Sequence, residues 1–283
     1  MWKSSRDAAH AEGVLARTSR PGPPALVRTL RSPELQWEPL VADDKRRAFA
    51  YVLRRERHSG LDAATVDAWF AALHPDACGA EAWTDAQSRG KPLLRRTAWV
   101  TFLPECSCEY GYADTWQLRA TDDAFVRTLE GIRTTVAEIV GLPADSLNCV
   151  NLNYYPCGGG VGFHADDEFL FDGMEREATI VSLSLCAPGG GERLFQVRRR
   201  DGGAAHETVL RHGDLMTMEG LFQLFWLHSV YPGDRCDVTD DPLVLGERIN
   251  LTFRRIVQHL DGSTECRGQV CALACNNRKT SVI

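Results

Sequence analysis

Three His-x-Asp pairs are the residues of this chain whose types and spacing suit metal chemistry. They are His74 and Asp76, His164 and Asp166, and His212 and Asp214. Because side chains alternate along a strand, the imidazole and the carboxylate of such a pair lie on the same side. With one more histidine they form the ligand face of non-haem Fe(II) oxygenases, which leaves three coordination positions open. The pair alone is weak evidence, so its surroundings must decide.

Two of these pairs have a simpler structural explanation. The first lies beside Pro75, at the end of a predicted helix, where a capping turn accounts for it. The third lies in the segment RHGDLMTM, which has the pattern of a turn entering a strand. The next histidine, His228, comes only 14 residues after Asp214, a short distance for a return from a neighbouring strand. Neither pair is therefore expected to bind a metal.

The middle pair has the surroundings of a metal site. It follows the glycine-rich segment CGGGVGF, which allows a close approach of the backbone. His228 comes 62 residues after Asp166, which is enough chain for three or four strands. We therefore expect a metal site made of His164, Asp166 and His228.

The segment RINLTFR alternates strictly between polar and apolar residues, as a strand with two different faces does. Its polar residues are Arg248, Asn250, Thr252 and Arg254. An amphipathic edge strand would have the same pattern, but that alternative does not explain why the polar face follows a candidate metal histidine. The two arginines are roughly 20 Å apart along a strand. They could bracket a small dicarboxylate from two ends.

The elements that must position these residues fall into two classes along the chain. Residues 46–57, 62–73 and 122–140 have apolar residues at helical spacing, with Asp62 as an N-cap and Gly141 as a stop. After residue 148, short strand-like runs are separated by glycines. They are CVNLNYYP, ATIVSLSLCA, ERLFQVRR, HETVLRHGDLMTM, LFWLHSVY and RINLTFRRIV. Helices followed by short strands predict an α+β chain built around an antiparallel sandwich or jelly roll.

Composition excludes several classes of protein. The chain has 283 residues, 44% hydrophobic and 25% charged, which excludes wholesale disorder. It has no apolar run of the roughly 20 residues that cross a bilayer, and its start lacks the apolar region of a secretory signal. We expect an intracellular monomer in the nucleus or cytoplasm with no membrane partner, although residues 1–31 leave organelle targeting open. A net charge of −6 requires local basic patches for any nucleic-acid contact.

The motifs, in this order, resemble the AlkB family of Fe(II)- and 2-oxoglutarate-dependent dioxygenases. The pattern begins with Asn153-x-Tyr155-x-x-Gly158, and the strings HADDE, HGDLMTM and RINLTFR follow it. These strings are close to those of the nucleic-acid-repair members, and the resemblance covers roughly residues 85–258. It implies a double-stranded β-helix (jelly-roll) core with the N-terminal helices packed on it.

The resemblance also implies how the cofactors are bound. Iron would be held by His164, Asp166 and His228. One carboxylate of 2-oxoglutarate would lie near Asn153 and Arg254. The far carboxylate would lie near Tyr155, Arg248 and Asn250. With O2 as the second cosubstrate, the reaction would remove N-alkyl groups from bases such as 1-methyladenine or 3-methylcytosine in DNA or RNA, releasing formaldehyde, succinate and CO2.

Two alternatives stay open. The same chemistry could act on a tRNA modification, a protein side chain or a lipid, which the negative net charge favours and the HADDE string opposes. A catalytically inactive binding module could keep the fold, but all three metal ligands and both arginines are present.

Candidate substrate contacts come from the segment before the core and from two loops. A flipped base is usually stacked on a ring, and the ring opposite His164 is expected to come from Trp99, Tyr110 or Tyr112. Trp99 has an equal alternative as a core residue. Glu168 is placed by the resemblance at the base edge, where a carboxylate accepts from an exocyclic amine; a solvated loop acid is the alternative. Phosphate contacts are expected from Arg198, Arg199 and Arg200 and from a second cluster, Lys91, Arg95 and Arg96.

The cysteines are interpreted mostly as reduced thiols. Five of them are additional to the family pattern: Cys106, Cys108, Cys266, Cys271 and Cys275. A structural zinc site drawing on both groups is an alternative, but no CxxC pair of the usual spacing is present. We expect four regions: a flexible extension (1–45), a helical and lid region (46–148), the catalytic core (149–260) and a cysteine-containing tail (261–283).

Overall fold

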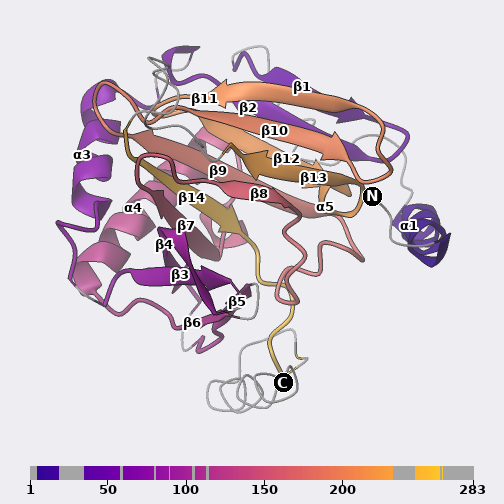
Figure 1. Ribbon diagram of the computed structural model, residues 1–283, viewed down its shortest axis with the longest axis horizontal. Helices are drawn as coiled ribbons and strands as arrows, with labels where there is room; N and C mark the ends of the chain where they lie inside the picture. The colour runs from indigo at the N-terminus through magenta and orange to yellow at the C-terminus, as the bar shows by residue number, and fades with distance from the viewer. Residues whose placement is uncertain are drawn as a thin grey trace.

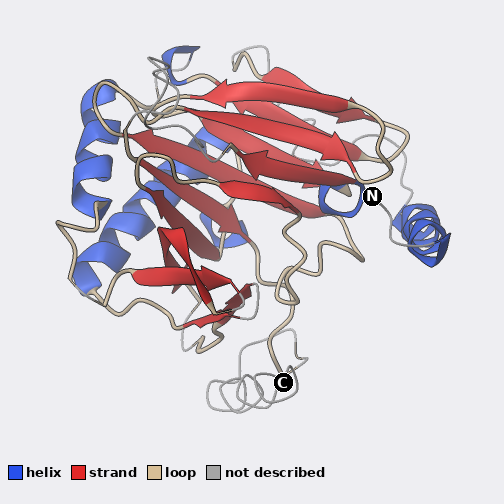
Figure 2. Ribbon diagram, in the orientation of Figure 1, coloured by secondary structure: helices blue, strands red, loops and turns tan. Residues whose placement is uncertain are grey.

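The computed structural model describes residues 5–18, 35–57, 60–79, 81–88, 90–103, 106–112, 115–231, 246–261 and 263. In this part of the chain two antiparallel sheets form the core (Figures 1 and 2). Apolar residues from both sheets share one buried cluster, so the sheets face each other. This arrangement confirms the α+β fold with a jelly-roll core.

The larger sheet has the strand order β1-β2-β12-β9-β14-β7-β4-β3 among the described residues. Its strands are β1 (Glu38–Asp43), β2 (Ala48–Leu53), β3 (Thr84–Ser88), β4 (Lys91–Thr101), β7 (Cys149–Tyr155), β9 (Ala178–Cys186), β12 (Leu215–Gly220) and β14 (Arg248–Arg254). Strand β14, the RINLTFR segment, lies between β7 and β9 at the middle of the sheet. The edge-strand alternative for this segment is therefore wrong.

The smaller sheet has the order β11-β10-β13-β8. Its strands are β8 (Val161–His164), β10 (Arg193–Arg199), β11 (Ala205–Leu210) and β13 (Trp226–Val230). Strands β8 and β13 pair so that His164 lies opposite His228. A separate ribbon of β5 (Tyr110–Tyr112) and β6 (Thr115–Gln117) lies at the lower end of the view in Figure 1. Short helical turns occur at η1 (Arg55–Arg57), η2 (Ala144–Ser146) and α5 (Phe222–Phe225).

Helices α3 (Ala63–Leu73) and α4 (Asp123–Val140) pack on the face of the larger sheet that points away from the smaller one. The carboxylates of Asp62 and Asp122 accept N–H groups in the first turns, as N-caps do. Gly141 ends α4 in the left-handed conformation, with φ of 69°. Both helices confirm the sequence prediction.

The helix expected at residues 46–57 is wrong, because most of this segment forms strand β2. All six residues of AFAYVL are buried. Alternate side chains, such as Phe49 and Val52, belong to the cores on opposite faces of the sheet. A strand buried on both faces has no polar alternation, so its apolar run cannot be distinguished from a buried helix by periodicity.

The flexible extension expected at residues 1–45 is also partly wrong. Helix α1 (Ser5–Thr18) buries Ala11 and Val14 in the core shared by the two sheets, and β1 is the edge strand of the larger sheet. Because β1–β4 belong to the same sheet as β14, the expected boundary at residue 148 does not separate two bodies. Most of the cysteine-containing tail lies outside the described residues.

Two further findings concern the cysteines and the membrane. Cysteines 78, 106, 108, 149 and 186 are not in disulfides, whereas Cys157 is disulfide-bonded. No helix in the described part of the chain is long and apolar enough to span a bilayer.

Candidate active site

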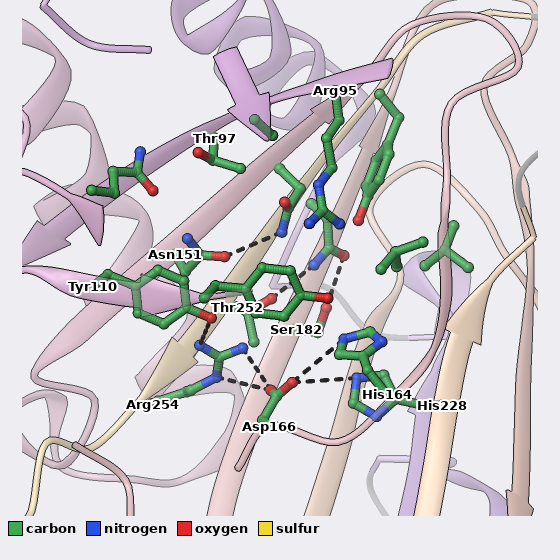
Figure 3. A pocket seen from close by; sticks show the side chains of 18 of the residues that line it. Arg95, Thr97, Tyr110, Asn151, His164, Asp166, Ser182, His228, Thr252 and Arg254 are labelled. Carbon is green, nitrogen blue, oxygen red and sulfur yellow. Dashed lines mark hydrogen bonds and ion pairs between the residues drawn. The ribbon is translucent and has the colours of Figure 1, made fainter. Parts of the chain in front are cut away.

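The three side chains expected to hold a metal lie together between the sheets (Figure 3). Oδ1 of Asp166 is 3.7 Å from Nε2 of His164 and 3.5 Å from Nε2 of His228. The two imidazole rings have centroids 4.2 Å apart. Strand pairing between β8 and β13 brings the histidines together, and Asp166 follows two residues after β8 ends. Two imidazole nitrogens and one carboxylate oxygen form the donor set of a 2-His-1-carboxylate iron site.

The second oxygen of Asp166 is fixed by the protein. Arg254 donates to Oδ2 from Nε at 2.9 Å and from Nη2 at 2.6 Å. The backbone N–H of Asp166 donates to Oε1 of Gln223 at 2.8 Å. Burial by itself would raise the pKa of Asp166, but Arg254 and both imidazoles outweigh it and lower that pKa well below its usual range. Asp166 is therefore an ionised carboxylate that presents only Oδ1 to the histidines.

The imidazole of His164 has the tautomer that a metal requires. Its Nδ1 lies 2.9 Å from the carbonyl oxygen of Gly162. A carbonyl can only accept, so Nδ1 carries the proton and the lone pair of Nε2 points toward Asp166. Burial, followed by the neighbouring His228, lowers the pKa of His164 to about 3, so the ring is neutral near pH 7. The chemistry of this donor set fits Fe(II).

The polar face of β14 forms the floor of the pocket beside these ligands. Asn250, Thr252 and Arg254 line the pocket. Asn250 donates through Nδ2 to Oγ1 of Thr252 at 2.8 Å, and its Oδ1 accepts from Ser182 at 2.9 Å. The apolar residues of β14 belong to the core beneath α3 and α4. The polar face of the strand thus lines the pocket and the apolar face lies in the core, as the alternation in the sequence predicted.

Arg248 is a buried cation with unused donors, next to the pocket-lining Tyr155 and Asn250 but not itself among the lining residues. It has no exposed surface, and the ring centroid of Tyr155 lies 5.6 Å from its guanidinium carbon. Nη2 donates to Ser184 at 2.9 Å and to Asn250 at 2.6 Å, while Nε and Nη1 have no partner among the described residues. A buried guanidinium with two unpaired donor nitrogens is an incomplete anion site. It fits a carboxylate, such as one end of 2-oxoglutarate.

The other expected carboxylate contacts are Asn153 and Arg254, and both line the pocket. Asn153 lies opposite Asn250 in the pairing of β7 with β14 and donates to Oδ1 of Asn151 at 3.1 Å. Arg254 donates hydrogen bonds to Asp166 through Nε and Nη2, and its Nη1 donates to the hydroxyl of Tyr110 at 3.3 Å. The contact of Arg254 with the metal ligand was not expected from the sequence.

Two tyrosines, Tyr110 and Tyr112, form an aromatic wall on the other side of the metal ligands. Tyr110 and Tyr112 of β5 both line the pocket, with Arg95 of β4. The ring of Tyr112 meets that of His164 edge-on, with centroids 6.1 Å apart. The guanidinium carbon of Arg95 lies 5.1 Å from the Tyr112 ring centroid. Tyr112 is therefore the ring that the structure places beside His164.

Trp99 takes the core role that was its alternative, and Glu168 does not line the pocket. Trp99 has no exposed surface, stacks on Tyr110 at 5.0 Å and donates to the carbonyl of Cys108, so it is a core residue that supports the wall. Glu168 accepts a hydrogen bond from the hydroxyl of Tyr110 and does not line the pocket. Burial raises the pKa of Glu168 to about 7. Tyr110 thus engages Oε1 of Glu168, whereas its Oε2 has no hydrogen-bond partner among the described residues, so the contact with a base edge stays a prediction.

The three arginines that end β10 do not lie in the pocket. Arg198 is exposed, and its guanidinium carbon lies 3.9 Å from the ring centroid of Phe163. Arg199 forms an ion pair with Asp201, and Arg200 donates to the carbonyl of Gln223 at 3.2 Å. Arg199 and Arg200 are thus engaged within the protein. Phosphate contact stays a prediction for these three arginines, of which Arg198 is the exposed one, and for Lys91, Arg95 and Arg96.

Several pocket residues were missed by the sequence reasoning. They are Gln117, Asn151, Ser182, Met216 and Met218. Asn151 could have been found, because the alternation in CVNLNYY puts it on the same face as Asn153 and Tyr155. The two methionines had no distinguishing signal, since methionines in strands are usually core residues.

Comparison with known proteins gives a family for this architecture. Residues 58–254 match the family described as the 2OG-Fe(II) oxygenase superfamily. The Mus musculus protein named DNA oxidative demethylase ALKBH2 is 32% identical over 149 residues, which are 50% of this chain and 55% of that protein. The Arabidopsis thaliana protein of the same name is 30% identical over 140 residues, 41% of this chain and 40% of that protein. The chain thus spans about half the length of the curated relatives it matches. Their names confirm the resemblance to the AlkB family.

Two solved structures are also similar. One is described as the structure of OsALKBH1, with 19% identity and a TM-score of 0.48 over 73% of this chain and 97% of that one. The other is an oxidoreductase of the 2OG-Fe(II) oxygenase family from Burkholderia pseudomallei, with 13% identity and a TM-score of 0.44 over 84% of this chain and 92% of that one.

Proposed function

Because this chain belongs to the 2OG-Fe(II) oxygenase superfamily, we propose that it uses Fe(II), 2-oxoglutarate and O2 to remove N-alkyl groups from nucleic-acid bases. The substrates are bases of the 1-methyladenine and 3-methylcytosine type in DNA or RNA, and the products are formaldehyde, succinate and CO2. The observation that carries the proposal is the His164–Asp166–His228 cluster in a pocket with an aromatic wall. Similarity to proteins named DNA oxidative demethylase supports the substrate class.

In this proposal the cofactors are held by the residues already described. His164, Asp166 and His228 would hold the iron. When bound, iron and 2-oxoglutarate supply the oxidising chemistry, and the protein supplies orientation and a shielded site. Arg248, with its two unpaired donor nitrogens, would bind the far carboxylate beside Tyr155. The near carboxylate would lie by Asn153 and Arg254.

The substrate base would enter on the side of Tyr112. A base lesion reaches a buried metal only from a single strand or after it has flipped out of a duplex, and it is then usually stacked on a ring. Tyr112 supplies such a ring beside His164. Arg95, next to Tyr112, places a positive charge at the same wall. A nucleic-acid substrate also agrees with the nuclear or cytoplasmic location expected from the sequence.

A second candidate keeps the chemistry but changes the substrate to a tRNA modification, a protein side chain or a lipid. One observation favours it: three of the groups expected to meet nucleic acid have partners within the protein. Glu168 binds Tyr110, Arg199 binds Asp201, and Arg200 binds the carbonyl of Gln223.

Mass spectrometry of oligonucleotides that carry single methylated bases distinguishes these candidates. DNA and RNA versions are incubated with the protein, Fe(II) and 2-oxoglutarate, with His164→Ala as the inactive control. Loss of one methylene mass per methylated base, only with the unsubstituted protein, supports the dealkylase. Succinate formation with no change in any oligonucleotide rejects the nucleic-acid substrate and favours the second candidate.

A further inference from the structure

A second cluster of side chains of types that can bind a metal ion lies outside the active site. Cys106, Cys108 and His259 bring two thiols and one imidazole within 4.8 Å of one another. Nδ1 of His259 is 3.2 Å from Sγ of Cys108 and 4.0 Å from Sγ of Cys106. None of the three residues is more than 3% exposed. We propose that this cluster binds a zinc ion.

The geometry and the ligand types favour zinc. A tetrahedral zinc ion, with Zn–S near 2.3 Å and Zn–N near 2.0–2.1 Å, holds its ligand atoms about 3.5–4 Å from one another. The two sulfur–nitrogen distances lie close to this range. Neither cysteine is part of a disulfide, so both sulfurs can act as thiolate ligands. Thiolates with an imidazole suit zinc, whereas calcium and magnesium require oxygen ligands.

The ligands come from two segments that the fold already holds in place. The carbonyl of Cys108 accepts from the indole of Trp99 at 3.0 Å, and the backbone N–H of Cys106 donates to Leu103. On the other segment, Asn148 forms two hydrogen bonds with the backbone of Ile256, three residues before His259. A site whose ligands are fixed by neighbouring contacts loses little conformational entropy when the metal binds.

The zinc ion would link the segment that carries the aromatic wall of the active site to the segment that follows β14. Cys108 precedes Tyr110 by two residues, and His259 follows Arg254 by five. Tyr110 and Arg254 contact each other, and Arg254 holds Asp166. The site is therefore structural in role: it fixes the two segments that meet behind the metal ligand. Cys266, Cys271 and Cys275 lie outside the described residues, so the proposal rests on three ligands.

Metal analysis of the full chain tests this site separately from the iron site. In the His164→Ala protein, which lacks one iron ligand, we expect about one zinc per chain by inductively coupled plasma mass spectrometry. After exchange with Co(II), the unsubstituted protein should show a sulfur-to-cobalt charge-transfer band in the near ultraviolet. No sulfur belongs to the His164–Asp166–His228 cluster, so that band reports the second site alone.

Variants identify the ligands. Cys108→Ser and His259→Gln should lose the zinc and the band, while Cys78→Ser, which changes a free thiol elsewhere, should keep both. Absence of the band from the folded unsubstituted protein overturns the proposal, and this measurement needs no variant to fold. Retention of full zinc content and band by a folded Cys108→Ser protein also overturns it.

Discussion

Replacing Arg248 by methionine tests the assignment of the 2-oxoglutarate site, because it separates binding from stability. In the structure this guanidinium is fully buried, and two of its nitrogens, Nε and Nη1, have no partner among the described residues. Methionine has a similar length and no charge. We therefore expect Arg248→Met to fold and to lose 2-oxoglutarate binding.

The magnitude follows from the two unpaired donors. A hydrogen bond to a charged group contributes about 1.5–3 kcal/mol, so Nε and Nη1 together would contribute about 3–6 kcal/mol to binding. At about 1.4 kcal/mol per factor of ten, the Kd for 2-oxoglutarate should rise roughly 100- to 10,000-fold. Without 2-oxoglutarate, removal of a poorly paired buried charge should leave the free energy of unfolding unchanged or raise it by about 1 kcal/mol.

Arg193→Met is the matched control, because this arginine is equally buried but fully engaged. It is 1% exposed and donates to the backbone carbonyls of Pro156, Gly159, Glu192 and Gly246. Its removal should lower the free energy of unfolding by about 3 kcal/mol and leave the Kd unchanged. The Kd is measured by calorimetry with Mn(II) in place of Fe(II), and stability by urea unfolding. Normal 2-oxoglutarate binding by Arg248→Met would refute the assignment.

Three further predictions concern the metal, the substrate wall and pH. Asp166→Asn should bind no iron and should unfold at a lower temperature, because Arg254 loses its buried counter-ion; metal analysis and circular dichroism check this. Tyr112→Ala should lower kcat/KM for methylated oligonucleotides at least tenfold while the Kd for 2-oxoglutarate stays unchanged, and an equal loss of both would contradict the role of this ring. Burial raises the pKa of Glu219 from 4.5 to about 8, so the free energy of unfolding should fall as the pH rises between these values, since the unfolded chain releases this proton first. Glu219→Gln should lack that fall in urea unfolding at about pH 5 and pH 8.

The sequence predicted those parts of the site in which neighbours along the chain share one face. Arg248, Asn250, Thr252 and Arg254 alternate within one strand, so their common face follows from strand geometry alone. The metal ligands could also be predicted, because a glycine-rich turn and a distant histidine distinguished one His-x-Asp pair from the other two. Helices α3 and α4 followed from capping residues and apolar spacing.

What the sequence could not give is contact between distant segments. Strand β2 is apolar on both faces because cores lie on both sides of it, and no local pattern carries that information. Glu168 accepts a hydrogen bond from Tyr110, 58 residues away. Cys106 and Cys108 lack a CxxC pattern, and their partner His259 lies about 150 residues further along the chain. The proposed zinc site therefore became visible only when these segments were placed in space.

The charges of the pocket indicate what can select the substrate. Arg254 is paired with Asp166, whose free oxygen faces the two histidines. Arg248 has unpaired donors that fit a carboxylate. With a metal dication and a dicarboxylate bound, each of these buried charges would have a partner of opposite sign, and their sum would be only +1. Selection of the substrate would then depend on the wall, where Tyr112 offers a ring and Arg95 a cation. This is why Tyr112→Ala should affect the substrate and leave 2-oxoglutarate binding intact.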